Sequence, residues 1–125
     1  DVNGKVSASG FKSVLVNRDI SLAGEQHIEV GFRPRAVIFF ATVPGSPRRI
    51  SWGIDDGVTP YAVADYHNIT ANVYTVIAQS IRLYTSLGND ISAKIINFSD
   101  TGFTLTWTKT GTTTGTAQVL ALALR

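Results

Sequence analysis

Apolar and polar side chains alternate most clearly near the C-terminal end of the sequence. Between Gly102 and Lys109, the large apolar residues Phe103, Leu105 and Trp107 alternate with three threonines. Side chains of a β-strand point to opposite faces with a period of two. The segment is therefore predicted to be a strand with one buried face and one polar face, and Trp107 is expected in the core.

Two other segments are apolar on both faces. Thr116–Leu124 ends the sequence, and Ala36–Val43 reads Ala-Val-Ile-Phe-Phe-Ala-Thr-Val between Pro34 and Pro44. Runs of this length without alternation are typical of strands that are covered on both sides. In a two-layer sandwich the outer faces meet solvent, so loops or another subunit must cover these strands. We therefore expect the protein to form oligomers.

Turn signals divide the rest of the chain into short segments. Pro44-Gly45-Ser46-Pro47 predicts a tight turn, after which Arg48–Ile54 returns as the hairpin partner of the preceding strand. Ala71–Thr85 has apolar residues at helical spacing, but its Val, Ile, Tyr and Thr content favours a strand over the alternative of a helix. The remaining predicted strands are Phe11–Asn17, His27–Phe32 and Ile91–Phe98.

About eight short strands separated by turns predict an all-β fold, an antiparallel sandwich or jelly roll. A length of 125 residues suits one domain over residues 1–125. The chain begins at Asp1 and contains no methionine, which indicates a processed product or a piece of a longer protein.

Composition narrows the function classes. Hydrophobic residues make up 44% of the chain and charged residues 16%, typical of a globular domain with little surface charge. A net charge of +2 is too small to indicate binding to nucleic acid or a membrane. The absence of cysteine excludes disulfides, zinc–thiolate sites and cysteine catalysis.

The ionisable residues offer no catalytic constellation. Asp55 and Asp56 are adjacent, so in a strand they point to opposite faces and form no acid–base dyad. Hairpin pairing would place Arg35 near Asp56, which predicts a cross-strand ion pair or simple solvation in a loop, with a calcium-binding loop as the alternative. His27 and His67 are too few for a histidine-rich metal site. We expect no enzyme activity, no metal and no cofactor.

Aromatic residues are the better candidates for ligand contacts. Trp52 shares its face with Ile50 and Ile54, and this pattern favours packing of Trp52 in the core. The segment Thr59–Asn68 is more polar and looser, and it contains two tyrosines and a histidine. Exposed rings beside carboxylates and amides are typical of carbohydrate sites, because rings stack on sugars while polar groups fix hydroxyls. The candidate ligand-binding residues are Trp52, Asp55, Asp56, Tyr61, Tyr66 and His67.

Two separate segments resemble one known class of module. Gly31–Phe40 is similar to the Gly-Phe-x-Pro-x-x-Val-Ile-Phe opening of small modules in structural proteins of tailed bacteriophages. Asp100–Thr108, followed by Val119–Leu124, resembles the close of those modules. The resemblance implies a non-enzymatic virion component at the particle surface, either a capsid decoration or head-fibre protein or a tail-fibre or tail-tip domain. It also implies a trimer whose partners are other virion proteins.

The same residues resemble the H-type lectins, which are β-sandwich trimers with a Pro-x-x-Val strand, a later Gly-Phe strand and an apolar final strand. Leu122-Ala123-Leu124 stands where a tryptophan-containing ending is common in that family. This resemblance implies an H-type-lectin-like sandwich and, as the alternative function, a carbohydrate-binding module that recognises a cell-surface glycan. A solvent-facing Trp52 or a cleft at Tyr66 and His67 would favour the lectin, whereas buried aromatic residues would favour the scaffold.

Overall fold

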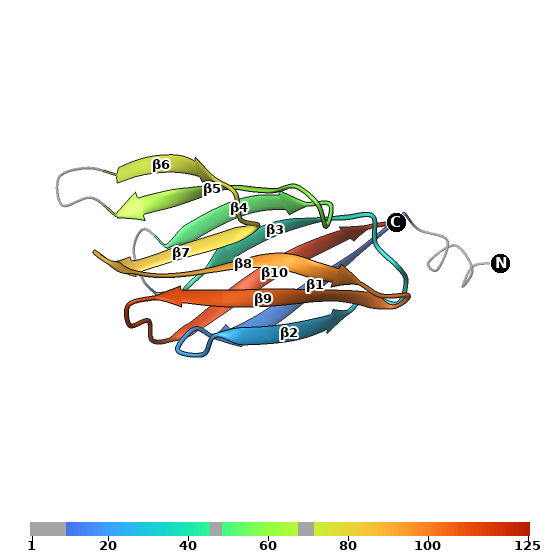
Figure 1. Cartoon of the computed structure of the whole chain (residues 1–125), viewed down its shortest axis with the longest axis horizontal. Coiled ribbons are helices and arrows are strands. Elements are labelled where there is room, and N and C mark those ends of the chain that lie inside the picture. The colour runs from blue at the N-terminus through green and yellow to red at the C-terminus, as the bar shows by residue number, and fades with distance from the viewer. Residues whose placement is uncertain (1–9, 46–48, 68–71) are drawn as a thin grey trace.

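Two antiparallel β-sheets pack face to face (Figure 1). The computed structural model describes residues 10–45, 49–67 and 72–125, without the side chains of residues 66, 67, 72 and 73. Within these residues the chain forms ten strands and no helix. The expected all-β antiparallel sandwich is confirmed, although the expected number of about eight strands is too low.

The larger sheet has six strands in the order β1-β10-β3-β4-β5-β6, and the smaller has four in the order β2-β9-β8-β7. The strands of the larger sheet are β1 (Phe11–Asp19), β10 (Thr116–Leu124), β3 (Ala36–Thr42), β4 (Ile50–Asp55), β5 (Pro60–His67) and β6 (Asn72–Ile77). The strands of the smaller sheet are β2 (Gly24–Glu29), β9 (Gly102–Thr110), β8 (Asn89–Phe98) and β7 (Ile81–Ser86).

The core lies between the two sheets and is built by strict alternation. In β9, Phe103, Leu105 and Trp107 all point inward and are buried, as the sequence pattern predicts. Phe103 meets Phe39 of β3 edge to face, with ring centroids 5.8 Å apart and planes at 76°. The indole N–H of Trp107 donates a hydrogen bond to Gln26 Oε1 at 3.0 Å, which satisfies its only polar group. The predicted core position of Trp107 is confirmed.

The strand content between residues 59 and 86 differs from the prediction. The segment predicted to be looser and polar contains β5, a regular strand between β4 and β6. The stretch Ala71–Thr85 is extended rather than helical where it is described, but it forms two strands, β6 and β7, in different sheets. Residues 78–80 carry the chain from one sheet to the other. A change of sheet leaves no mark on the period-two pattern, so the sequence could not reveal it.

One close approach makes this crossing possible. The carbonyl oxygen of Ser80 lies where a side chain on Gly53 would be, because a Cβ at Gly53 would come within 1.7 Å of it. Gly53 is in β4 and faces inward, so only a residue without a side chain leaves room for the crossing segment.

The hairpin predicted for β3 and β4 is confirmed by their antiparallel register, which pairs Val37 with Asp55. Residues 46–48 of the predicted turn lie outside the described residues.

Candidate functional site

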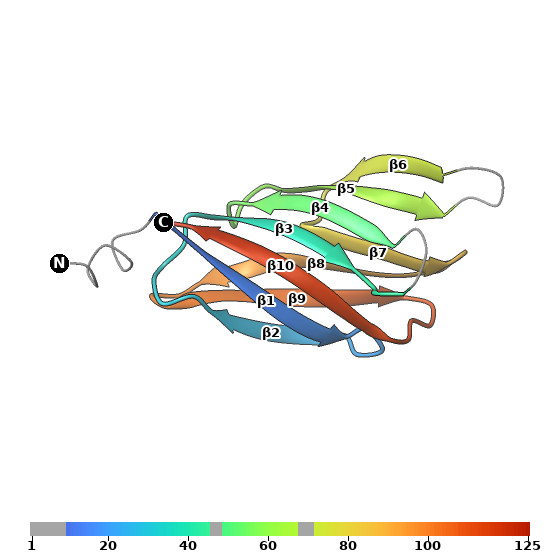
Figure 2. The same cartoon turned by 180° about the vertical axis from the view of Figure 1, so that it is seen from behind.

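The outer surface of the six-stranded sheet is apolar from one edge to the other. Strand register places one outward-facing residue of each strand directly opposite the next, so that a single row crosses the whole sheet. All six residues of this apolar row are large and hydrophobic, and each is between 37% and 66% exposed. The row consists of Leu15, Leu120, Phe40, Trp52, Val63 and Val76. Figure 2 views the sheet from this side.

The rows on either side of the apolar row differ in polarity. One side carries Leu122, Ile38, Ile54 and Tyr61 in register on β10, β3, β4 and β5. The other side begins with three polar but uncharged residues, which are Asn17, Gln118 and Thr42. We call the apolar row and the four apolar residues beside it the outer face. None of the residues named in these three rows is charged, so the surface is hydrophobic with a polar rim along one side.

The outer face is hollowed around its aromatic residues. One open hollow of about 390 Å³ lies between Leu15, Phe40, Trp52 and Leu120. A second, of about 260 Å³, lies on the other side of Trp52 and is lined by Tyr61 among other residues. The Trp52 ring also packs against Tyr74 of β6, with centroids 6.0 Å apart. Apolar hollows flanked by large rings are the usual form of the anchoring positions in protein interfaces.

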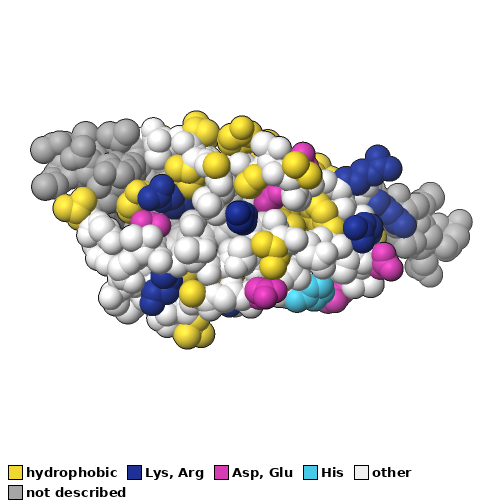
Figure 3. Space-filling model, in the orientation of Figure 1, with side chains coloured by type: hydrophobic (Ala, Val, Ile, Leu, Met, Phe, Trp, Pro, Cys, Tyr) yellow, Lys and Arg dark blue, Asp and Glu magenta, His cyan; other side chains and the backbone are white. Residues whose placement is uncertain are grey.

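The outer surface of the four-stranded sheet is polar by contrast. Threonines 104, 106 and 108 of β9 face outward there, beside His27 of β2 and Lys94 of β8. Figure 3 shows this side as mostly white with scattered charges, whereas yellow side chains gather in the upper part of the view, along β5 and β6. The outer surfaces of the two sheets therefore differ in polarity. Only the polar surface, on the four-stranded sheet, is typical of a face exposed to water.

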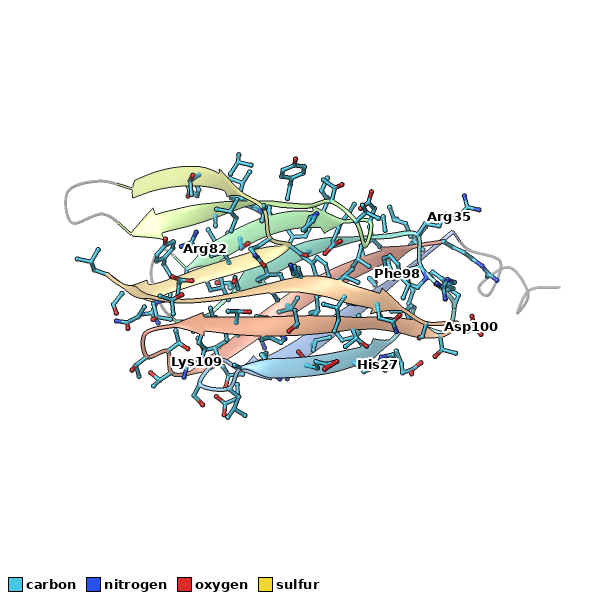
Figure 4. The ribbon with its side chains drawn as sticks, in the orientation of Figure 1. His27, Arg35, Arg82, Phe98, Asp100 and Lys109 are labelled. Carbon is cyan, nitrogen blue, oxygen red and sulfur yellow. The ribbon has the colours of Figure 1, made fainter. Side chains whose placement is uncertain are left out.

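His27 belongs to a group of polar side chains in contact on that second surface (Figure 4). Its Nε2 lies 2.7 Å from Glu29 Oε1, and its Nδ1 lies 3.1 Å from Thr104 Oγ1. Hydrogen bonds from Thr101 and then from His27 lower the pKa of Glu29. Within the described part of the chain, no group of three or more His, Cys, Asp or Glu side chains is placed to hold a metal ion. The cluster consists of side-chain contacts between neighbouring residues of β2 and β9.

The candidate ligand-binding residues separate into different places. Trp52 and Tyr61 both face outward, are 39% and 51% exposed, and line the same hollow. The expected core position of Trp52 is therefore wrong. The reason is that β4 turns its small and polar residues inward, where Gly53 makes room for the Ser80 carbonyl.

The two aspartates do not join these aromatic residues. Asp55 is 1% exposed and points between the sheets. Its carboxylate accepts hydrogen bonds from the amides of Gly57 and Ile95, at 2.7 and 2.8 Å, and from the Ser80 hydroxyl. All of these donors belong to the protein itself, so Asp55 holds the fold together and does not face an external ligand.

Asp56 lies just after β4 and is exposed. Its carboxylate accepts the backbone amides of Val58 and Thr59, at 2.9 and 2.7 Å. The hydrogen bond from Thr59, and then that from Val58, lowers the pKa of Asp56. Among the described residues, Asp56 forms no ion pair with Arg35, so the expected cross-strand pair is absent. Tyr66 and His67 belong to β5, but their side chains lie outside the described residues.

The sequence indicated only part of the outer face. Ala36–Val43 and Thr116–Leu124 were identifiable because both of their faces are apolar. The contributions of Leu15, Val63 and Val76 were not, since none of these residues belongs to either of the two apolar runs. Their alignment into one row depends on strand register, which is set by long-range pairing.

Comparison of the sequence with protein-family models finds no match, and searches of curated proteins and of solved structures find none either. The described residues include no helix long and apolar enough to cross a membrane. The interpretation of the site therefore rests on the geometry of the outer face and on the sequence motifs.

Proposed function

We propose that the protein is a non-enzymatic structural component of a tailed-phage virion that works by assembling, through its outer face, into a homotrimer at the particle surface. The observation that carries the assembly is the apolar row across all six strands of the larger sheet. The location on a virion is supported by the sequence motifs at Gly31–Phe40 and Asp100–Thr108.

The size of the outer face supports an interface. Six strands spaced about 4.8 Å apart give an apolar width of roughly 24 Å. Monomeric proteins rarely expose a contiguous apolar patch larger than a few hundred Å², because burying such a patch contributes about 25 cal/mol per Å². Phe40, Trp52 and Leu120 lie at its centre, around the larger hollow, and are the expected anchors of the contact.

The first test is the mass of the protein in solution. We expect light scattering coupled to size exclusion to give a trimer for the unaltered protein. Leu120→Lys places a charge at the centre of the outer face and should produce monomers. Ile96→Lys is the matched control, because Ile96 is similarly exposed but belongs to β8 of the other sheet. A monomeric unaltered protein, or equal effects of the two variants, would contradict assembly through this face.

The virion location needs a separate measurement. Mass spectrometry of purified particles from the phage that encodes the chain should detect it at a copy number that is a multiple of three. Its absence from washed particles, with other structural proteins present, would refute this part of the proposal and leave the assembly unaffected.

A carbohydrate-binding module is the second candidate function. It is favoured by one observation, namely that the rings of Trp52 and Tyr61 are exposed around one hollow, and a solvent-facing Trp52 is the outcome expected above for a lectin. The other residues lining that hollow are apolar or glycine, so few groups there can fix sugar hydroxyls. A glycan array probed with the unaltered protein, Trp52→Ala and Tyr61→Ala tests it. Specific binding lost in both variants would support the module, and an array without signal would exclude it for the glycans tested.

A further inference from the structure

The two sheets end in four edge strands, β1 and β6 in the larger sheet and β2 and β7 in the smaller. An edge strand exposes unpaired backbone N–H and C=O groups, to which a strand of another chain can add. Proteins commonly block such edges with charged residues, prolines, bulges or very short strands.

Three of the four edges carry such blocking features. Strand β2 contains two glutamates, Glu25 and Glu29. Strand β7 contains Arg82, and its pairing with β8 is interrupted by a register shift between Tyr84 and Ser86. Strand β1 contains three charged residues, which are Lys12, Arg18 and Asp19.

Strand β6 has none of these features. It reads Asn-Val-Tyr-Thr-Val-Ile, without charge, proline or glycine. Its register with β5 runs without a shift from the pair His67–Asn72 to the pair Ala62–Ile77. Tyr74 and Val76 are both more than half exposed on its outward side. Among the described edges, β6 is therefore the one open to strand addition.

We propose that β6 pairs antiparallel with β6 of a second copy of this chain. The other described edges are blocked, so the available complement to β6 is the same strand in another subunit. A contact of a surface with its own copy requires a two-fold axis. Because β6 is uncharged, it can meet its copy without repulsion between like charges. Strand β1, with its three charged residues, is less suited to such pairing.

The side chains of β6 favour one register. A two-fold axis through the middle of the pair can place Thr75 opposite Thr75 of the partner subunit. The same register places Tyr74 opposite Val76 of the partner subunit. Threonine pairs and pairs of an aromatic with a β-branched residue are among the stabilising cross-strand combinations. The pairing joins the two larger sheets into one and brings their outer faces to the same side.

This contact goes beyond the proposed trimer, because it uses main-chain groups at an edge, whereas the trimer uses side chains on the outer face. If a subunit makes both contacts, β6 pairing would link one trimer to another. The orientation of Thr75 allows an experiment to distinguish the β6 contact from the outer-face contact. Thr75 is adjacent to outward-facing Tyr74 and so points to the opposite side of the sheet, where contact between outer faces does not bring two copies of it together.

The chain contains no cysteine, so Thr75→Cys supplies a single thiol. Opposite residues of an antiparallel pair have Cα atoms about 4.5–5.5 Å apart, within the range of about 4.4–6.8 Å found in disulfides. Mild oxidation of the folded variant should give a covalent dimer on a non-reducing gel. The matched control is Val16→Cys, a half-buried residue on the inward side of edge strand β1. We expect at least a fivefold higher dimer yield for Thr75→Cys, and a fall to the control yield in urea.

A Thr75→Cys yield no higher than that of Val16→Cys, with both variants folded, would overturn the proposal. Hydrogen exchange of the unaltered protein provides a second measurement if the variant does not fold. Amides of β6 should exchange more slowly at high protein concentration than at low concentration, whereas those of β2 and β7 should not change. Equal exchange of β6 at both concentrations, over a range that includes oligomer formation, would overturn the pairing as well.

Discussion

The carboxylate of Asp55 accepts a hydrogen bond from the backbone amide of Ile95, 2.8 Å away on the opposite sheet. Asp55 belongs to β4 and Ile95 to β8, so this contact ties the two layers together through one buried side chain. The same carboxylate also accepts the amide of Gly57 and the hydroxyl of Ser80. A buried carboxylate with three internal donors is satisfied in place, and it fixes the position of the segment that crosses between the sheets.

Replacing Asp55 should therefore cost stability. Asp55→Ala leaves the buried amide of Ile95 without an acceptor, which we expect to lower the free energy of unfolding by about 3 kcal/mol. Urea denaturation followed by tryptophan fluorescence measures the loss. Asp56→Ala is the control, since Asp56 is exposed, and its effect should be clearly smaller. Equal effects of the two substitutions would show that the contact between the sheets contributes little.

Gly53 is expected to tolerate no side chain. In Gly53→Ala the new Cβ would lie 1.7 Å from the Ser80 carbonyl oxygen, so the backbone of the crossing segment must move. Such overpacking should lower the free energy of unfolding by about 3 kcal/mol. Gly10→Ala is a suitable comparison, because nothing lies within 4 Å of the added Cβ there. The measurement is the melting temperature of both variants, which should fall for Gly53→Ala and stay nearly the same for Gly10→Ala. An unchanged melting temperature for Gly53→Ala would contradict the close approach.

Phe39 and Phe40 are neighbours in β3 with opposite environments, the first fully buried and the second 45% exposed. Phe39→Ala should lower the free energy of unfolding by about 4 kcal/mol, because it leaves a cavity against Phe103. Phe40→Ala should leave the stability of the subunit nearly unchanged and weaken self-association. Denaturation and sedimentation equilibrium on the same two variants separate these effects. A large loss of subunit stability in Phe40→Ala would mean that the outer face is part of the core.

Acid should destabilise the fold through Asp56. Its hydrogen bonds hold the pKa below the ordinary value of 3.8, so the folded state binds the proton less readily than the unfolded state. The resulting stability is fully present above the unfolded pKa and is lost as the pH falls through the folded pKa. Melting temperatures from about pH 5 to about pH 2 should therefore fall more steeply for the unaltered protein than for Asp56→Asn. Parallel curves would show that Asp56 does not contribute.

Strand identity was largely readable from the sequence where the pattern is local. The alternation of Phe103, Leu105 and Trp107 predicted both β9 and its buried side, because one strand supplies the whole signal. The apolar runs of β3 and β10 likewise indicated strands that need cover on both sides. Strand β5 was missed, since its inward positions are Ala62 and Ala64, which are too small to give a strong alternation.

In β4 the sequence determined which residues share a face, and the tertiary structure decided which face is inside. The apolar side chains of Ile50, Trp52 and Ile54 alternate with Ser51, Gly53 and Asp55, and the pattern alone favours the apolar set as the buried one. The structure reverses this assignment. Gly53 admits the Ser80 carbonyl and Asp55 accepts the amide of Ile95, and both contacts come from segments far along the chain. Hydrophobic periodicity is a local property, whereas the choice between core and outer face depends on long-range contacts that close only when the two sheets meet.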